Sequence, residues 1–435
     1  MALDLAPAPH RVEKSRAVLA AALDVGCAKT VCLATPMSCT APGQRGRPLD
    51  VIGAGIQATS AASGAADFES CARSIRIAID EAERGAEESI REVVACYSGP
   101  GLHARIVRGQ ARVRGTEIGV REAQAALAAA IHAAPAPGKA ALHVAPLGYS
   151  IDGGALVSDP RGRQGSTLTV EACIVTAPGQ AVDALRQCIR AAGVEPADIV
   201  AAPYAAALGA ATDEERAQGV LVIDLGAGGA GVAVLCAEGL VHVDHVPIGG
   251  ARMTRDLAKA LGATFPAAER AKLLHGVVGG AYDPREALEA PRVGDDGRLE
   301  AQIIAKKTIH DALAPRFRET ILLARARVAE ARLGANRAPQ RAILTGGGAQ
   351  IAGAREVAQE LLGLPVRIGR PMGVNDIDAG QAGAAFTTAA GLLRWRLDRP
   401  PEAAEAQAYE PSLREVSRAA TAAASRAWAW LKDNF

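Results

Sequence analysis

The chain has 435 residues, which is long enough for two or more domains with separate cores. Hydrophobic residues make up 49% and charged residues 22%, as expected of a globular protein. The formal net charge of +1 gives no electrostatic support for a general nucleic-acid role, and no apolar run approaches the roughly 18 residues of a membrane span.

The N-terminal region predicts one half of an α/β fold. Residues 1–16 are expected to form a disordered leader. The apolar strand that follows ends at Asp24, just before the tight turn Gly26-Cys27-Ala28-Lys29 and a second apolar strand. A third strand at 50–55, a helix at 68–88 and a strand at 90–99 come next. This βββαβ order is typical of a ribonuclease-H-like half.

Two segments interrupt the core pattern. Residues 100–166 combine an Arg-rich alternating strand with an alanine-rich helix, which indicates a small inserted subdomain. Residues 263–316 are polar and punctuated by Pro and Gly, and a helix from Arg316 returns to the core. The predicted divisions are a first half at 17–99 and 167–203, an inserted subdomain at 100–166, a second half at 204–262 and 317–393, a small subdomain at 263–316, a flexible linker at 394–412 and a terminal helix at 413–435.

A second glycine-rich turn lies in the second half. Two β-branched, apolar runs flank Gly226-Ala227-Gly228-Gly229, and Asp224 closes the first run. Glycine puts no Cβ in the way, so backbone N–H groups of such a turn can converge on a polyphosphate. Asp224 can then hold a hydrated divalent cation. The alternative is a plain hairpin turn in which Asp224 is only a turn former.

The pattern occurs twice, which favours the phosphate site. Asp24 and Asp224 are 200 positions apart, about the size of one domain. A third glycine loop, Gly346-Gly347-Gly348, follows a short apolar run and precedes a predicted helix. Two acidic glycine hairpins and a late glycine loop resemble the actin/Hsp70/sugar-kinase superfamily. The resemblance implies duplicated halves whose phosphate loops face each other across a cleft, with the third loop at the adenosine.

Cysteine and histidine spacing predicts no metal centre. The eight cysteines form no CxxC pair, so reduced thiols are expected, and Cys27 is of interest because it lies in the first glycine turn. His242 and His245 are three residues apart in a predicted strand and are expected on opposite faces of it.

The last segment predicts an amphipathic helix. At 100° per residue, Leu413, Trp428, Leu431 and Phe435 fall on one narrow stripe with basic flanks. Such a helix, carried on the linker at 394–412, is typical of binding at an anionic membrane surface. The alternative is a terminal helix that docks on the protein's own body. Alanine occupies much of the stripe, so attachment by one copy is expected to be weak and to need many linked copies.

Combined with these features, further motifs resemble the FtsA family of actin-like bacterial cell-division proteins. They are Leu23-Asp24-Val25-Gly26 with Lys29, His143-Val144-Ala145-Pro146, Pro203-Tyr204-Ala205, Asp224-Leu225-Gly226, Pro247-Ile248-Gly249-Gly250, Ala268-Glu269-Arg270-Ala271-Lys272 and Leu344-Thr345-Gly346-Gly347. The resemblance covers about residues 23–393. It implies an α/β, actin-like fold with ribonuclease-H-like duplicated halves, an FtsA-type inserted subdomain and a C-terminal amphipathic helix.

The resemblance also implies a site for ATP and Mg²⁺. Asp24 and Asp224 would hold the magnesium through water, and the remaining contacts would come from both halves. Those contacts are Gly26, Cys27, Ala28 and Lys29 with Gly226, Gly228 and Gly229 at the phosphates, Glu269 and Lys272 at the ribose and base, and Gly346, Gly347 and Gly348 at the adenosine.

Partners follow from the same resemblance. The expected partners are the C-terminal peptide of FtsZ, further copies of this chain in a filament, other division proteins and anionic inner-membrane lipid, but not nucleic acid. The FtsZ peptide is expected near Arg292, Arg298, Arg316 and Glu319. The location implied is the cytoplasmic face of the inner membrane at the division site.

The chain departs from the family pattern beside the phosphates. Cys27 stands where a hydroxyl residue is usual, Gly229 where a Thr is usual, and Gly231 near a usual Asp. Because these changes remove groups that orient an attacking water, the protein is expected to be at most a weak ATPase. The alternatives are a small-molecule kinase or a chaperone-like ATPase of the same superfamily. The Gly229–Gly231 stretch offers no catalytic base for the kinase, and the segment after Leu393 is too short for a chaperone's substrate domain.

Overall fold

The computed structural model of the chain describes residues 18–37, 48–59, 67–134, 137–294, 296–375, 383–398 and 400. The predicted leader, most of the linker and the terminal helix, including Leu413, Trp428, Leu431 and Phe435, lie outside these residues. Within the described ranges, no helix combines the length and the apolar character needed to cross a bilayer.

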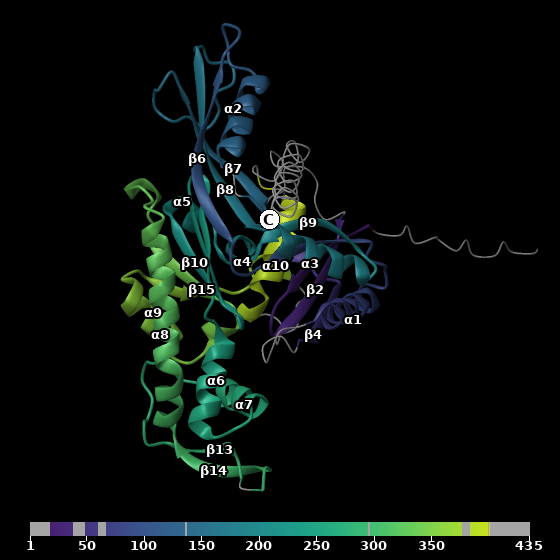
Figure 1. Ribbon diagram of the computed structural model, residues 1–435, viewed down its shortest axis with the longest axis vertical. Helices are drawn as coiled ribbons and strands as arrows, with labels where there is room; N and C mark the ends of the chain where they lie inside the picture. Colours follow the sequence, from purple (N-terminus) through teal and green to yellow (C-terminus); the bar gives the residue numbers. More distant parts are fainter. Residues whose placement is uncertain are drawn as a thin grey trace, which may run out of the picture.

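The first half is built on a five-stranded sheet in the order β4-β2-β1-β5-β9 (Figure 1). Its apolar strands lie almost wholly in the core, and helix α1 begins after Asp67, whose side chain accepts from the Ser70 amide. The elements are β1 (Leu19–Val25), β2 (Lys29–Pro36), β4 (Gly53–Ala58), α1 (Phe68–Ala86), β5 (Glu92–Tyr97), α3 (Gly179–Ala191) and β9 (Glu195–Ala201). A short strand, β3 (Leu49–Asp50), pairs with β17 (Val374–Asn375) of the second half.

The second half and the inserted subdomain share one eight-stranded sheet, in the order β16-β15-β10-β11-β12-β6-β8-β7. The strands of the second half are β10 (Val220–Leu225), β11 (Ala230–Cys236), β12 (Gly239–Val246), β15 (Arg341–Thr345) and β16 (Val366–Ile368). The inserted subdomain contributes β6 (His103–Arg112), α2 (Val120–Ala133), β7 (Lys139–Ile151) and β8 (Thr167–Pro178). The two parts meet where Asp244 of β12 pairs with His103 of β6.

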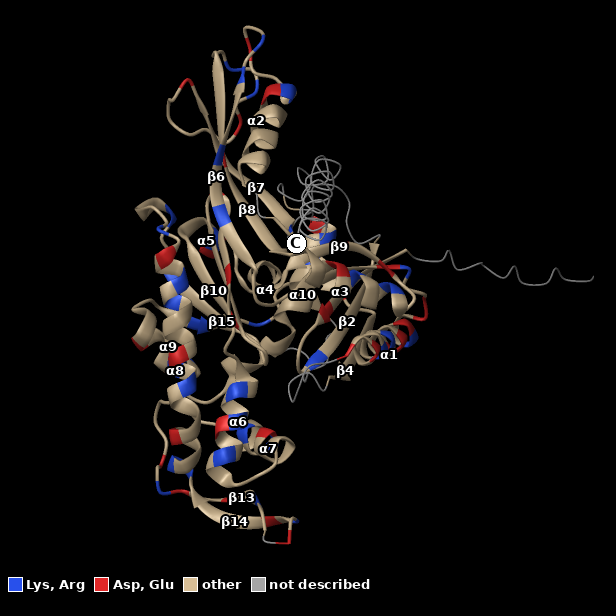
Figure 2. Ribbon diagram, in the orientation of Figure 1, with Lys and Arg blue, Asp and Glu red and all other residues tan. Residues whose placement is uncertain are grey.

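The remaining helices surround the second half. They are α4 (Ala202–Ala210), α5 (Asp213–Gln218), α6 (Gly250–Leu261), α7 (Phe265–His275), α8 (Lys306–Glu330), α9 (Ala354–Leu362) and α10 (Thr387–Asp398), with short 3₁₀ turns at Ala335–Arg337, Gly347–Gln350 and Ala384–Phe386. A hairpin of β13 (Ala287–Val293) and β14 (Leu299–Ala305) lies at the far end of α8. Charged residues are frequent along the outer helices α1 and α8, whereas the central strands carry few (Figure 2).

Helix α8 differs from the sequence prediction, which began it at Arg316. It starts ten residues earlier and runs through Pro315, because Ile309, Leu313 and Phe317 form a buried face at helical spacing. The segment 263–316 is therefore mostly regular structure rather than broken chain.

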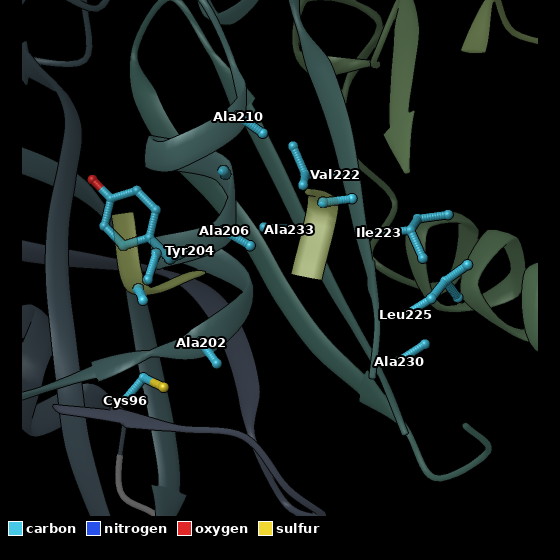
Figure 3. Packing of buried hydrophobic residues seen from close by; sticks show 14 of the residues in the cluster. Cys96, Ala202, Tyr204, Ala206, Ala210, Val222, Ile223, Leu225, Ala230 and Ala233 are labelled. Carbon is cyan, nitrogen blue, oxygen red and sulfur yellow. The ribbon is translucent and has the colours of Figure 1, made fainter. Parts of the chain in front are cut away.

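Helices α4 and α10 join the two halves at the centre of the molecule. Tyr204 and the alanines of α4 are packed among the strands (Figure 3), and Gly209 and Gly391 allow the two helices to approach at backbone distance. His143 of β7 accepts a 2.9 Å hydrogen bond from the Ala201 amide, and burial lowers its pKa to about 3. The rings of Tyr204 and Trp395 pack edge-on against it. A neutral histidine therefore helps to fix the inserted subdomain onto this centre.

Candidate functional site

The two predicted glycine turns meet between the two halves of the fold. They close the β1–β2 and β10–β11 hairpins, whose last pairs are Val25–Thr30 and Leu225–Ala230. A Cβ built on Gly228 would lie 2.6 Å from the Cys27 sulphur, and the Gly228 amide donates a hydrogen bond to that sulphur. Turns 200 residues apart in sequence are thus in contact.

The first glycine of each turn shapes its own hairpin. The Gly26 amide donates to the Lys29 carbonyl, and the Gly226 amide donates to the Gly229 carbonyl, both at 3.0 Å. Because these donors are used inside the turns and the Gly228 amide is directed at the Cys27 sulphur, the amides of residues 27, 28 and 229 are the better candidates for contacting a phosphate.

Two carboxylates and one lysine lie at the base of the turns. Desolvation raises the pKa of Asp24, and desolvation together with the Asp24 charge raises the pKa of Asp224 to about 7. Burial lowers the pKa of Lys29, whereas both aspartates act to raise it, and its Nζ lies 3.3 Å from the centroid of the Phe386 ring. The single positive charge of Lys29 therefore lies near two carboxylates, Asp24 and Asp224, which repel each other when both are ionised.

This donor set fits a hydrated magnesium ion. Carboxylate oxygens are the ligands that hard divalent cations prefer, and a cation near Asp24 and Asp224 would relieve their repulsion. Among the described residues no three His, Cys, Asp or Glu side chains form a metal-binding group. The fit is therefore to an ion held largely by water and phosphate oxygens, as is usual for magnesium.

The third glycine loop packs directly against the second turn. Strand β15 runs parallel to β10 with Thr345 opposite Asp224, which brings the loop to the carboxylate. Gly346 has a φ of +80°, and a Cβ there would overlap the Asp224 carboxylate. A Cβ on Gly348 would lie 3.0 Å from that of Leu225, whereas Gly347 has open space around it. Only glycine at 346 permits this approach.

Glu269 and Lys272 of α7 lie on the other side of the second turn. Lys272 Nζ donates to Glu269 at 2.7 Å and to the Thr254 hydroxyl at 2.8 Å, and that hydroxyl also donates to Glu269. A Cβ on Gly250 would lie 3.4 Å from Lys272 Nζ, and the Gly250 amide donates to the Gly226 carbonyl at 2.9 Å. The predicted base and ribose residues are thus tied to the turn through the start of α6.

Sequence reasoning missed the residues that hold the carboxylates. The Cys96 thiol donates to Asp24 at 3.2 Å, and the Thr388 hydroxyl donates to Asp224 at 3.2 Å. His245 packs behind the second turn, with its ring 2.5 Å from a Cβ built on Gly229. Cys96 lies in an apolar strand and Thr388 in an alanine-rich helix, so no local pattern signals either role.

The residues predicted for the FtsZ peptide are already paired within the protein. Arg292 binds Glu300 at 2.9 Å, and Arg298 lies 3.6 Å from Asp296. Arg316 binds both Asp256 of α6, at 2.8 Å, and Glu319, at 2.6 Å. Their role in peptide binding stays a prediction, and a peptide would have to compete with these carboxylates.

Two ribonuclease-H-like halves with facing glycine turns define the actin-like class. The structure resembles that of a "PilM-PilN type IV pilus biogenesis complex", with a TM-score of 0.58 and 19% identity over 87% of this chain and 98% of the other. It also resembles MreB5 of Spiroplasma citri bound to ADP, with a TM-score of 0.50 and 13% identity over 89% and 99%. At these identities the likeness shows the fold, and it confirms the predicted class.

Sequence comparisons narrow the class to one family. The family model for cell division protein FtsA matches residues 221–391, and the model for the SHS2 domain inserted in FtsA matches residues 99–176. The FtsA of Rhizobium meliloti (strain 1021) is 31% identical over 99% of this chain and 97% of its own length. The FtsA of Pseudomonas aeruginosa is 28% identical over 87% and 89%, and that of Escherichia coli (strain K12) is 26% identical over 76% and 80%. The chain belongs to the FtsA family of cell-division proteins.

The matched insert extends beyond the predicted limit at residue 166. Strand β8 starts at Thr167 and pairs along its length with both β6 and β7, so it is part of the same sheet. Apolar composition alone had assigned this strand to the first half.

Proposed function

We propose that the protein is an ATP-binding, polymerising adaptor that anchors the FtsZ ring to the inner membrane and helps to recruit other division proteins. The observation that carries the proposal is the contact between the two glycine turns above the Asp24–Asp224 pair. A triphosphate bound there touches both halves, so its presence fixes the angle between them. That angle decides whether two copies stack into a filament.

The residues of this site have separate tasks in this proposal. Turn amides orient the phosphates, Lys29 meets their negative charge, and Gly346 and Gly348 give the adenosine a surface without side chains. Asp24 and Asp224 would hold Mg²⁺, which would supply positive charge to offset the negative charge of the phosphates. Thr388 and Cys96 hold those aspartates in place.

Nucleotide binding is tested by calorimetry on the full chain with ATP, in Mg²⁺ and in EDTA. Wild-type protein is expected to bind in Mg²⁺ and to lose at least about tenfold in affinity in EDTA, since charged contacts are worth about 1.5–3 kcal/mol. Asp24→Asn is expected to lose a similar factor, whereas Asp183→Asn, at an exposed aspartate of α3, serves as the matched control. Equal affinity with and without Mg²⁺ contradicts the assignment of the two aspartates.

Membrane attachment is tested by sedimentation with phosphatidylglycerol-containing vesicles. Removal of residues 413–435 is expected to abolish co-sedimentation, and the double change Trp428→Glu and Leu431→Glu is expected to do the same, because charge on the apolar stripe prevents insertion. Asp433→Asn, on the opposite side of the predicted helix, is the control. Full sedimentation of the doubly changed protein would remove the anchor from the proposal.

A further inference from the structure

A cavity of about 740 Å³ lies where the inserted subdomain meets the second half. Its walls come from β6, from β12 and from the C-terminal end of α8. Much of the lining is apolar, and it includes Leu102, Ile106, Val107, Val241 and Leu333. The volume lies in the range of about 300–1,000 Å³ that is usual for small-molecule sites.

The polar part of the lining contains buried groups with unused hydrogen-bonding capacity. The side chains of His242 and His245 belong to residues only 2% and 9% exposed, and both line the cavity. His242 Nε2 and His245 Nδ1 have no hydrogen-bond partner in the described part of the chain. Their spacing on β12 predicts that the two side chains leave opposite faces of the strand. A buried polar atom without a partner is costly, and a ligand at this site would remove that cost.

The Asp244 carboxylate already has hydrogen-bond partners. It accepts from the His245 backbone amide at 2.7 Å and lies 3.2 Å from His103 Nδ1. The His103 and His242 rings meet edge to face, with centroids 6.4 Å apart. Burial lowers the pKa of His242 to about 4 and also lowers that of His245, so both rings are neutral near pH 7. The inner end of the cavity therefore presents neutral imidazole donors and acceptors between apolar walls.

The rim of the cavity is positively charged on one side. Arg105 is exposed and lies two residues beyond His103 on β6, and therefore on the same side of that strand. Arg327 of α8 also lines the cavity, but it is paired with Glu330 at 3.1 Å. Arg105 is thus the better candidate for binding an anion.

We propose that this cavity binds a small aromatic molecule that carries one acidic group. A polar group attached to the ring hydrogen-bonds to His242 Nε2, the faces of the ring pack on the apolar walls, and the acidic group pairs with Arg105 at the rim. Aromatic rings suit the site because its walls are largely apolar and include the imidazole rings of His103 and His242.

The site also adjoins the second glycine turn. The His245 ring lies 2.5 Å from a Cβ built on Gly229, so a ligand that moves this ring moves the turn. This coupling rests on the proposed nucleotide function, whereas binding to the cavity does not.

The experiment uses two fluorescent probes with the full chain and no nucleotide. The first, 8-anilinonaphthalene-1-sulfonate, has an aromatic body and one acidic group; the second, N-phenyl-1-naphthylamine, has nearly the same body without the charge. Wild-type protein is expected to bind the sulfonate saturably at one cavity site. Ala331→Trp places a large ring in the cavity and is expected to remove that site, whereas Ala329→Trp, exposed and outside the lining, is the matched control.

Two further variants test the assigned contacts. Arg105→Ala is expected to weaken the sulfonate about tenfold and to leave the uncharged probe unchanged, whereas Arg121→Ala, at an exposed arginine of α2, is expected to affect neither. His242→Phe keeps a ring but removes the nitrogen, and is expected to weaken both probes. Identical binding to Ala331→Trp and Ala329→Trp overturns the proposal, because the probe then lies elsewhere or the cavity holds only water. If Arg105→Ala weakens the binding of both probes equally, the assignment of an acidic group to the ligand is wrong.

The coupling is read by repeating the sulfonate titration with saturating Mg²⁺-ATP. A change of threefold or more in its affinity supports contact through His245, and an unchanged affinity despite calorimetrically confirmed ATP binding refutes it. Failure of ATP to bind at all contradicts the proposed function instead, and leaves the nucleotide-free result for the cavity intact.

Discussion

The opposed carboxylates predict that Asp224→Asn stabilises the protein when no nucleotide is bound. The pKa of Asp224 is raised from an ordinary 3.8 to about 7, so the folded state resists losing this proton. Stability from such a group is fully present below the unfolded pKa and is lost as pH rises through the folded pKa. At 1.36 kcal/mol per pKa unit, the raised pKa of Asp224 lowers the stability by about 4 kcal/mol at pH 8, where the folded group is ionised, and by about 2 kcal/mol at pH 5, where it is still protonated. Asparagine removes this cost and still accepts the Thr388 hydroxyl.

The assay is thermal unfolding across pH, without nucleotide and then with Mg²⁺-ATP. A chain of this size should gain about 4–8 °C in Tm at pH 8 and less than half of that at pH 5. With Mg²⁺-ATP the order should reverse, because the variant lacks the charge that holds the metal. Asp183→Asn controls for removal of an exposed charge. An equal gain at both pH values, or no gain at pH 8, would refute the reasoning.

Three further predictions follow from contacts at the site and the core. Gly228→Ala should lower the affinity for ATP about tenfold, because the new Cβ would clash with the Cys27 sulphur. Adding Cys27→Ala should restore the affinity measured by calorimetry. If it does not, the clash is not the cause of the loss. Arg337→Met removes the 2.8 Å partner of Glu171 and leaves that carboxylate with Arg108 at 3.2 Å, so the variant should destabilise the chain by about 2 kcal/mol in urea unfolding and expose the inserted subdomain to limited proteolysis; an unchanged urea midpoint would count against it. Gly391→Ala should lower Tm severely because its Cβ meets the backbone of α4, whereas Gly347→Ala, in open space, should leave Tm unchanged.

Much of the fold could be predicted because its signals are local. An apolar strand, an acidic residue and a glycine turn occur twice, and these motifs led to the actin-like class and the FtsA family, both of which are confirmed. The start of α8 was missed because Pro315 reads as a helix boundary, although a buried face at helical spacing carries the helix through it.

The site was predictable only in part. The three glycine loops come together as expected, but their contacts with nucleotide stay predictions. Cys96 and Thr388 reach the aspartates from 72 and 164 residues away, and no short-range pattern reports such a distance. The ion pairs of Arg292 and Arg316 could not be predicted either, because the sequence identifies a cationic residue but not the carboxylate with which it pairs.

The shared eight-stranded sheet has a mechanical consequence. The inserted subdomain follows the first half in the sequence, yet its strand β6 pairs with β12 of the second half at His103 and Asp244. Any rotation of one half against the other must therefore either strain the pairing between β6 and β12 or move the inserted subdomain together with the second half. A small displacement at the glycine turns would therefore become a larger displacement at the end of β6 and α2 that lies farthest from the turns.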